Sequence, residues 1–290
     1  MIVKQLDHMT LFMMALVFIA AHVRLVGKKL RHTGIIQYFL HMLYGVAEPT
    51  ILRITDFIIT KKIIIDTAPG RAFYKLIATL SHYLPHGIIL TTRAAGKLLD
   101  YIEKTEGPGG ARIAVGPCVC QRSLNKWKEP SCKDIVILYG ADIYCYLDLG
   151  YRIITAAEAK NIVQECRKAG LVHTVDFCMQ SGKWAFVICN CDKDICVPVR
   201  TYLLTGKFVY PGPEIVAMDQ SKCLGEKKCG LCITSCLFGV NTPTGSKPTV
   251  DYAACLGCDL CVQTCKGNAR RMMRRFLYEH EDIMPPELLL

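Results

Sequence analysis

Residues 255–265 read CLGCDLCVQTC, and residues 223–236 read CLGEKKCGLCITSC. The last three cysteines of the earlier run each precede their counterparts in the later run by 29 residues, whereas the first cysteines are 32 residues apart. The two runs are therefore an internal repeat, with three extra residues in the earlier copy. Cysteines at such spacings are typical of metal ligands. The repeat contains Cys223, Cys229, Cys232 and Cys236 in its first copy and Cys255, Cys258, Cys261 and Cys265 in its second.

The composition is that of a globular protein from a reducing compartment. The chain has 290 residues, enough for about two domains. Its 51% hydrophobic and 21% charged residues exclude disordered and collagen-like chains. The 17 cysteines are an odd number in a chain much longer than small disulfide scaffolds, which favours metal binding over disulfides. The formal net charge of +10 suits an acidic partner or an anionic membrane surface.

The repeat resembles the bacterial two-cluster ferredoxins over residues 214–272. In that family, two C-x2-C-x2-C-x3-C runs exchange their fourth cysteines between two 4Fe-4S clusters. Two departures change the loops without removing a ligand: the insertion before Cys229, and Leu237 and Lys266 in place of the usual prolines. We expect a ferredoxin-like domain over residues 213–275 and a tail over residues 276–290. The resemblance implies one cluster on Cys223, Cys229, Cys232 and Cys265, and the other on Cys255, Cys258, Cys261 and Cys236.

The middle of the chain, residues 111–212, has the pattern of a small α/β domain rich in cysteine. Short apolar runs predict strands over residues 112–119, 134–139 and 184–191. A helix is predicted from an N-cap at Thr155 to Gly170, because Glu158 follows the cap at capping-box spacing. Strands separated by a helix favour some parallel pairing in one sheet.

Two C-x-C pairs, Cys118 with Cys120 and Cys189 with Cys191, close two of the predicted strands. Residues i and i+2 of a strand point to the same face, so each pair would present two thiols side by side. Four converging sulfurs suit zinc or a third iron–sulfur cluster. The alternative interpretation is that they are small buried hydrophobic residues. Further groups that could substitute as ligands or lie behind them are Cys132, Cys178, Cys196 and His173.

The segments 116–120 and 188–191, together with His173 and Cys178, are also similar to a cysteine-rich region of some ferredoxin-fused iron–sulfur proteins. This resemblance implies no particular substrate. It leaves open a reductase in which the middle domain holds the active site and the ferredoxin-like domain supplies electrons. No Walker A motif or Ser-His-Asp constellation points to another chemistry.

The first third of the chain, residues 1–106, is apolar, basic and predicted to be helical. Residues 1–110 contain 13 Lys and Arg against 7 Asp and Glu. The run Met9–Val26 is short for a membrane span and favours a buried or surface-lying helix. Glu106–Gly110 (EGPGG) is predicted to be a linker. Two core-facing stripes are predicted from helical spacing: Phe73, Leu76, Ile77, Leu80 and Leu84, and Ala95, Leu98, Leu99 and Ile102.

These patterns predict a multi-domain α+β protein with a helical N-terminal region, a small α/β domain rich in cysteine and a C-terminal dicluster ferredoxin-like domain. The expected function is iron–sulfur electron transfer, in which two 4Fe-4S clusters exchange single electrons with a redox protein partner. The N-terminal region would dock that partner or the inner face of a membrane, in the cytoplasm. The alternatives are the reductase described above and a metal-stabilised interaction protein. Nucleic acid is not an expected partner, because the arginines of Arg270–Arg275 more often form a solvated helix face or a partner dock.

Overall fold

The computed structural model describes residues 34–61, 64, 66–80, 86–105, 113–177 and 185–279. The chain is a mixed α/β protein with one large mixed sheet and two smaller two-stranded sheets. The predicted Met9–Val26 helix, the Glu106–Gly110 linker and Cys178 lie outside the described residues, as does most of the C-terminal tail. Within the described ranges, none of the helices is both long enough and apolar enough to cross a membrane.

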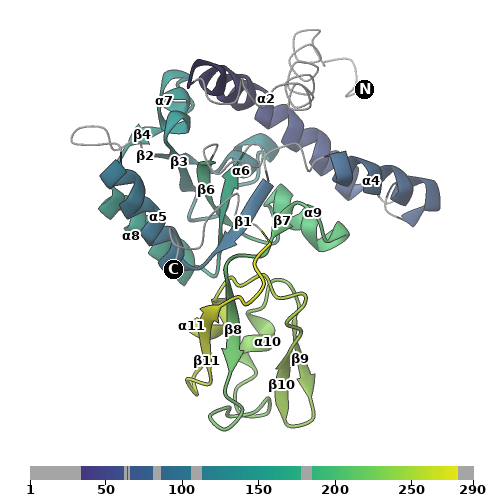
Figure 1. The fold of residues 1–290 in the computed structure, drawn as a ribbon. Coiled ribbons are helices and arrows are strands. Elements are labelled where there is room, and N and C mark those ends of the chain that lie inside the picture. The colour runs from purple at the N-terminus through teal and green to yellow at the C-terminus, as the bar shows by residue number, and fades with distance from the viewer. Residues whose placement is uncertain are drawn as a thin grey trace.

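The large sheet has seven strands in the order β4-β2-β3-β6-β5-β1-β7 (Figure 1). The ladders between these strands are antiparallel, except that β1 and β7 pair in parallel. The three strands predicted from the sequence correspond to β2, β3 and β6. The sequence favours some parallel pairing, and it is found between β1 and β7, whereas β2, β3 and β6 pair antiparallel. The strands are β1 (His86–Leu90), β2 (Ile113–Pro117), β3 (Cys132–Ile137), β4 (Arg152–Ile153), β5 (Val172–Phe177), β6 (Ala185–Cys191) and β7 (Val209–Tyr210).

Strand β1 and helix α5 (Thr92–Thr105) differ from the expectation that residues 1–106 form a separate helical region. β1 lies inside the sheet between β5 and β7, and its Ile88 pairs with Val175 of β5. Helix α5 buries its predicted stripe in the core of the same unit. A strand of five residues is too short for periodicity to distinguish it from a helix. The sequence therefore predicts the boundary after α5, at residues 106–111, although the α/β unit already includes β1.

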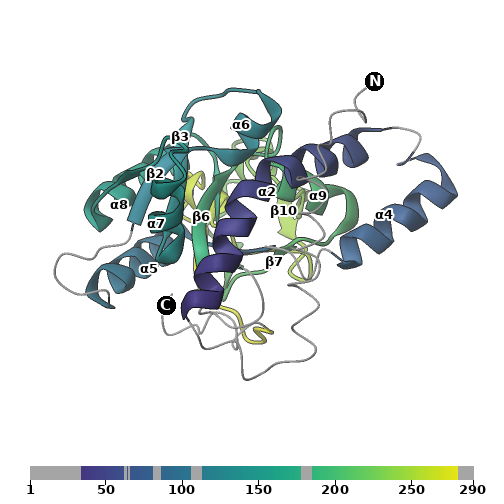
Figure 2. The ribbon, with the colours of Figure 1, turned by 90° about the horizontal axis from the view of Figure 1, so that it is seen from above.

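Helices cover both faces of the large sheet (Figure 2). Helices α5 and α8 (Ala156–Lys168) pack on one face. Alternate residues of each strand point to opposite faces of the sheet. In β3, Ile135 and Ile137 pack toward α5 and α8, whereas Val136 packs toward α7. The helices of the second face are α2 (Gly34–Thr60), α6 (Val119–Leu124), α7 (Tyr139–Tyr146) and α9 (Val197–Thr205).

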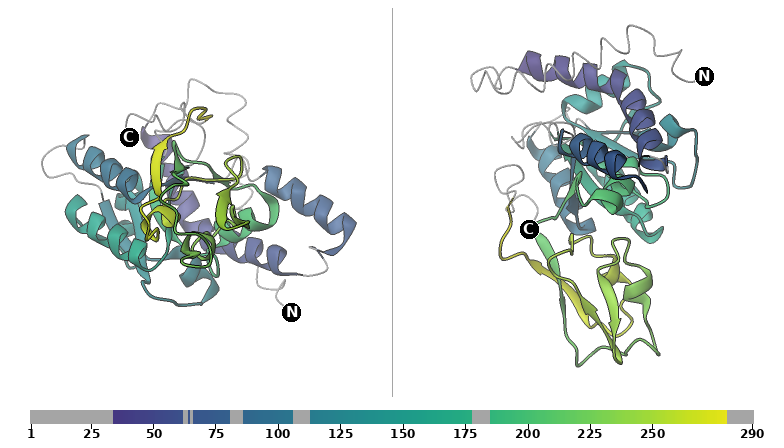
Figure 3. Two further views of the ribbon diagram at one scale, coloured as in Figure 1. Left: turned by 90° about the horizontal axis from the view of Figure 1, so that it is seen from below. Right: turned by 90° about the vertical axis from the view of Figure 1, so that its right-hand side faces the viewer.

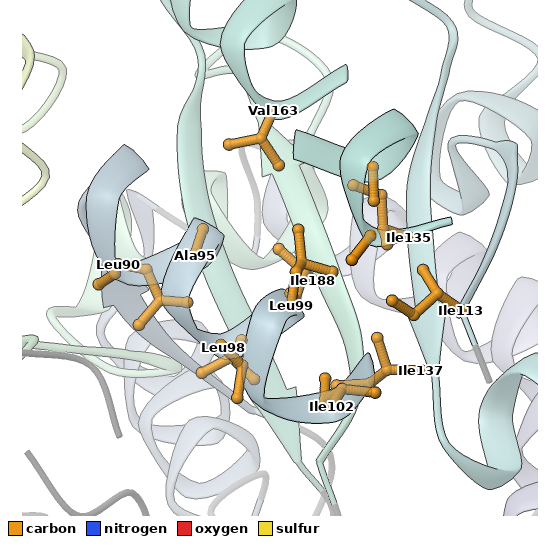
Figure 4. Packing of buried hydrophobic residues seen from close by; sticks show 14 of the residues in the cluster. Leu90, Ala95, Leu98, Leu99, Ile102, Ile113, Ile135, Ile137, Val163 and Ile188 are labelled. Carbon is orange, nitrogen blue, oxygen red and sulfur yellow. The ribbon is translucent and has the colours of Figure 1, made fainter. Parts of the chain in front are cut away.

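The core beneath α5 and α8 is aliphatic (Figure 4). Leu99 of α5 and Ile113, Ile135 and Ile188 of three adjacent strands are completely buried. Burying one such side chain contributes about 1.5–3 kcal/mol. This core stabilises the sheet. Cys120, Cys189 and Cys191 lie on the opposite face of the sheet.

Helix α8 begins at the predicted N-cap. The Thr155 Oγ1 accepts a hydrogen bond from the Glu158 amide at 3.2 Å. We expect Thr155→Ala to lower the free energy of unfolding by about 1 kcal/mol, because that amide loses its partner, and we expect Thr155→Ser to retain most of the stability. Urea unfolding followed by circular dichroism would measure both. Equal losses in the two variants would contradict the capping role.

Helix α4 (Ala68–Leu80) projects from the edge of the α/β unit (Figure 2). Its Phe73 and Leu76 are 48% and 56% exposed, so the predicted core-facing stripe is wrong at these two positions. Helical periodicity indicates an amphipathic helix but not which surface covers its apolar face.

Residues 213–275 form a small C-terminal unit beside the large sheet (Figures 1 and 3). Strand β8 pairs with β11 and strand β9 pairs with β10, both antiparallel. With the 29- or 32-residue repeat offset, β10 corresponds to β8 and β11 to β9. Each ladder therefore joins one strand from each copy. The elements are β8 (Glu214–Met218), α10 (Leu231–Thr234), β9 (Asn241–Thr244), β10 (Lys247–Val250), α11 (Leu260–Gln263) and β11 (Arg270–Arg274).

The arginine-rich segment is strand β11 and not the expected solvated helix face. Arg270 is buried, and its Nη1 donates to Asn241 Oδ1 at 2.7 Å. Arg275 donates to the carbonyl oxygens of Gly212 at 2.9 Å and Cys255 at 2.7 Å. These two guanidinium groups therefore connect β11 to β9 and to the segments around Gly212 and Cys255. Arginines on a solvated surface would not make such contacts.

Candidate metal centres

The C-terminal unit brings the fourth cysteine of the first run to the first three of the second. One cavity is lined by Cys236, Cys255, Cys258 and Cys261. These are the four residues that the ferredoxin resemblance assigns to one cluster. Val216 from the β8–β11 ladder also lines this cavity. Both copies of the repeat are therefore needed to build it.

The other set begins with Cys223, Cys229 and Cys232, which lie close enough for their charges to interact. The turn after Cys265 packs beside them, because a Cβ atom on Gly267 would lie only 2.5 Å from the carbonyl oxygen of Lys222. This proximity puts Cys265 next to the start of the first run, as the exchanged pattern requires.

Backbone amides point at two sulfurs of this second set. The Gly225 amide donates to Cys223 Sγ at 3.5 Å, and the Ala269 amide donates to Cys265 Sγ at 3.2 Å. Hydrogen bonds of this kind stabilise thiolate ligands and tune the potential of a cluster. The surroundings of these sulfurs therefore suit ligation.

Equivalent turns hold the two cysteine runs. Gly230 precedes α10 with φ 62°, and Asp259, its counterpart 29 residues later, precedes α11 with φ 60°. The runs meet where Ser235 Oγ lies 3.0 Å from Thr264 Oγ1, again at equivalent positions. The unit is thus approximately two-fold symmetric around this contact.

The described cysteines are all free thiols. In the part of the chain that the structure covers, no group of three or more His, Cys, Asp or Glu side chains is arranged to hold a metal ion. A four-iron cluster is larger than one ion and spreads its cysteine ligands over its corners.

A second cavity, of about 50 Å³, lies on the α2, α6 and α9 side of the large sheet. We call it the cysteine cavity. The pair Cys189 and Cys191 projects from one face of β6, as predicted. The other pair differs from the prediction, because Cys118 precedes helix α6 and Cys120 lies within it, not in a strand. Five cysteines line the cavity: Cys118, Cys120, Cys189, Cys191 and Cys196.

The five thiols are in contact with one another. Hydrogen bonds join them in the order Cys118, Cys120, Cys196, Cys191 and Cys189. Cys196, at the N-cap of α9, is the centre of this chain. Hydrogen bonds from Cys189 and Cys196 lower the pKa of Cys191 to about 5, and those from Cys118 and Cys196 lower the pKa of Cys120. The pKa values of the other three thiols rise.

Four carboxyl groups line the same cavity: Glu48, Asp134, Asp176 and Asp192. Asp192 forms an ion pair with Lys133, which also lines the cavity, at 3.7 Å. Burial raises the pKa of Asp134 to about 7 and the pKa of Asp176 to about 8. The thiol of Cys189 lies 3.4 Å from a carboxyl oxygen of both Asp134 and Asp176. The Tyr151 hydroxyl also donates to Asp134, at 2.5 Å. Asp134 and Asp176 can therefore hold protons near neutral pH beside the thiols.

Burial raises the pKa of Glu48 to about 8, although its hydrogen bond from the Tyr144 hydroxyl opposes the shift. The folded chain therefore keeps a proton that the unfolded chain releases above pH 4.5, and stability falls as the pH rises from about 4.5 to 8. We expect Glu48→Gln to stabilise the protein at pH 8 by on the order of 2 kcal/mol and to change little at pH 4.5. Denaturant titrations at the two pH values measure this, and an equal effect at both would contradict it.

A chain of hydrogen bonds leads from the cysteine cavity toward the C-terminal unit. Burial lowers the pKa of His173 to about 4, so the ring is neutral at pH 7. Its Nδ1 donates to Asn190 Oδ1 at 2.6 Å, and its Nε2 accepts from Thr92 Oγ1 at 3.2 Å. The Asn190 amide group in turn donates to the Lys133 carbonyl at 2.6 Å, which determines its orientation. Asn190 lies between two of the cavity cysteines.

The same chain reaches the Cys258 turn. The Thr92 amide donates to Asp259 Oδ2 at 3.3 Å. Arg167 of α8 forms an ion pair with the Asp259 carboxylate and donates to the carbonyl oxygens of Asp259 at 2.9 Å and Cys258 at 3.3 Å. Polar contacts thus connect the α/β unit directly to one of the cysteine runs.

The remaining candidates named from the sequence have different positions. Cys132 is exposed at the start of β3 and does not line the cavity. His173 lies behind the site and not in it. Cys196 was expected only as a substitute, because it lacks a C-x-C partner, yet it occupies the centre. Glu48, Asp134 and Asp176 come from α2, β3 and β5, so nothing near them in the sequence indicates that they line this cavity.

Comparisons with models of protein families, with curated proteins and with solved structures find no match to this chain.

Proposed function

We propose that the chain is an iron–sulfur electron-transfer protein whose C-terminal unit carries two 4Fe-4S clusters. The proposal assigns one cluster to Cys223, Cys229, Cys232 and Cys265, and the other to Cys236, Cys255, Cys258 and Cys261. It treats the protein as three parts: a helical N-terminal region, an α/β domain and a ferredoxin-like domain. Electrons would pass singly to and from a redox protein partner.

The observation that carries this proposal is the position of Cys236. If each cysteine run bound its own metal centre, Cys236 would lie with the three cysteines that precede it. Instead it shares a cavity with Cys255, Cys258 and Cys261, the crossed arrangement typical of two-cluster ferredoxins. Few apolar side chains are buried in this unit, so metal bonds would supply much of its folding energy.

The docking surface belongs to the same proposal. Phe73 and Leu76 of α4 are exposed, and the first third of the chain is basic. An apolar helix face beside positive charge suits an acidic redox partner or the inner, anionic face of a membrane. The proposal includes a cytoplasmic location, with α4 as the docking helix.

Anaerobic purification of the full chain tests the proposal. Iron, zinc and acid-labile sulfide are measured per chain, and the dithionite-reduced protein is studied by EPR. The C-terminal cysteines should account for about eight irons and eight sulfides and give two interacting spins. The exposed Cys132→Ser variant is the matched control and should keep the full content. Zinc without labile sulfide would overturn electron transfer in favour of a zinc scaffold.

A further inference from the structure

The cysteine cavity has the features of a binding site for a bound group. Protein interiors are close-packed, yet a cavity of about 50 Å³ remains open beside these five sulfurs, more than the roughly 10–15 Å³ that one water molecule needs by the same measure. Apolar side chains such as Ile51, Leu52 and Phe208 also line it, together with the carboxyl groups described above. Five soft sulfur donors in one pocket favour a thiophilic metal group.

We propose that this cavity holds a third iron–sulfur cluster, ligated by Cys118, Cys120, Cys191 and Cys196. Cys120, Cys191 and Cys196 are each buried to within 6% exposure, and their thiols are consecutive in the chain of sulfur contacts. Cys118 extends that chain at one end. The loop before α6, helix α6, strand β6 and the start of α9 thus supply one sulfur each.

Cys189 has a different role from these four. Its thiol lies 3.4 Å from both Asp134 and Asp176, so it acts as a hydrogen-bond donor to carboxyl groups. A protonated thiol beside a cluster contributes a dipole but no metal bond. The pairing of Cys189 with Cys191 in sequence therefore does not make both of them ligands.

The size of the cavity favours a cluster over zinc. Zinc binds four thiolates at about 2.3 Å in a tetrahedron, which leaves no open volume between the sulfurs. The sulfurs here line open space. Lys133, whose charge acts on Cys191, forms a buried ion pair with Asp192 in the same wall. A larger, multinuclear group fits this arrangement.

The position of the cavity connects it to the clusters of the proposed function, and this part of the inference rests on that function. Cys120, Cys191 and Cys196 belong to one apolar core with Leu256, Leu260 and Cys258. The His173 chain joins the same two places through hydrogen bonds. One electron would pass from the Cys258 cluster to the third cluster; the first is oxidised as the second is reduced, and no bond is made or broken.

Metal analysis of the full chain and three variants tests the proposal. The unmodified protein should contain about twelve irons and twelve sulfides, and Cys196→Ser should lose about four of each. Cys189→Ser and the exposed Cys132→Ser should keep all of them. Mössbauer spectra of the unmodified protein would count the clusters independently, so the test does not depend on the Cys196→Ser variant folding.

One result would overturn the third cluster, and another would overturn its ligand assignment. About eight irons with one zinc in the unmodified chain would assign the cavity to zinc and leave the two C-terminal clusters in place. Iron loss in Cys189→Ser equal to that in Cys196→Ser would overturn the ligand assignment. Failure of the proposed function is distinguishable, because about four irons that depend on Cys196 would then remain while no iron depends on Cys236 or Cys265.

Discussion

Replacing Cys236 by serine should remove about four irons, and the iron lost should be that of the cluster formed by the later cysteine run. Cys236 follows Cys232 closely in sequence, but it lines the cavity of Cys255, Cys258 and Cys261. The loss should also loosen the whole C-terminal unit, because metal bonds compensate for its small core. Iron and sulfide analysis with EPR of the reduced protein measures the effect.

Double variants separate crossed from uncrossed ligation. Cys236→Ser with Cys258→Ser should lose no more iron than Cys236→Ser alone, because both residues would hold the same cluster. Cys236→Ser with Cys229→Ser should lose about eight irons, because two clusters are affected. The reverse pattern would show that each run binds its own cluster and would refute the exchange.

Arg167→Met should cost about 3–5 kcal/mol of unfolding free energy. Arg167 is 3% exposed and its partner Asp259 is 13% exposed, so the substitution leaves a carboxylate in a poorly solvated place and also removes donors to two carbonyl groups. The contacts between α8 and the Cys258 turn should open before the rest of the protein unfolds. Guanidinium unfolding and limited proteolysis of the holoprotein measure this loss.

Two controls isolate the buried charge as the cause. Asp259→Asn added to Arg167→Met should restore more than half of the loss, because the amide removes the charge and asparagine tolerates the positive φ at this position. Arg152→Met removes a similar ion pair with Glu158 that is exposed on both sides, and it should barely change the unfolding midpoint. Equal losses for Arg152 and Arg167 would contradict the importance of burial.

The sequence predicted best what repeats or alternates. The 29-residue offset indicated the two cysteine runs, and the equivalent turns at Gly230 and Asp259 have nearly equal φ values. Alternation predicted that Cys189 and Cys191 share one face of β6. These inferences succeed because the period of a strand or a repeat is a local property that side chains reveal directly.

What the sequence did not predict depends on contacts between distant segments. Strand β1 has only five residues, so its pairing with β5 and β7 is what distinguishes it from a helix. Phe73 and Leu76 have helical spacing, but their side chains are about half exposed among the described residues. Cys196 and Glu48 join the cysteine cavity from two different helices, and nothing near either residue in the sequence indicates that they meet.

The first and last strands of the C-terminal unit lie side by side. Strands β8 and β11 pair antiparallel, with Glu214 opposite Arg274. Just beyond this pair, the Arg275 amide donates to the Pro213 carbonyl at 2.7 Å. The chain therefore enters and leaves this unit at one point, and a gene segment encoding residues 213–275 could be inserted into a surface loop of an unrelated protein without separating the ends of that loop.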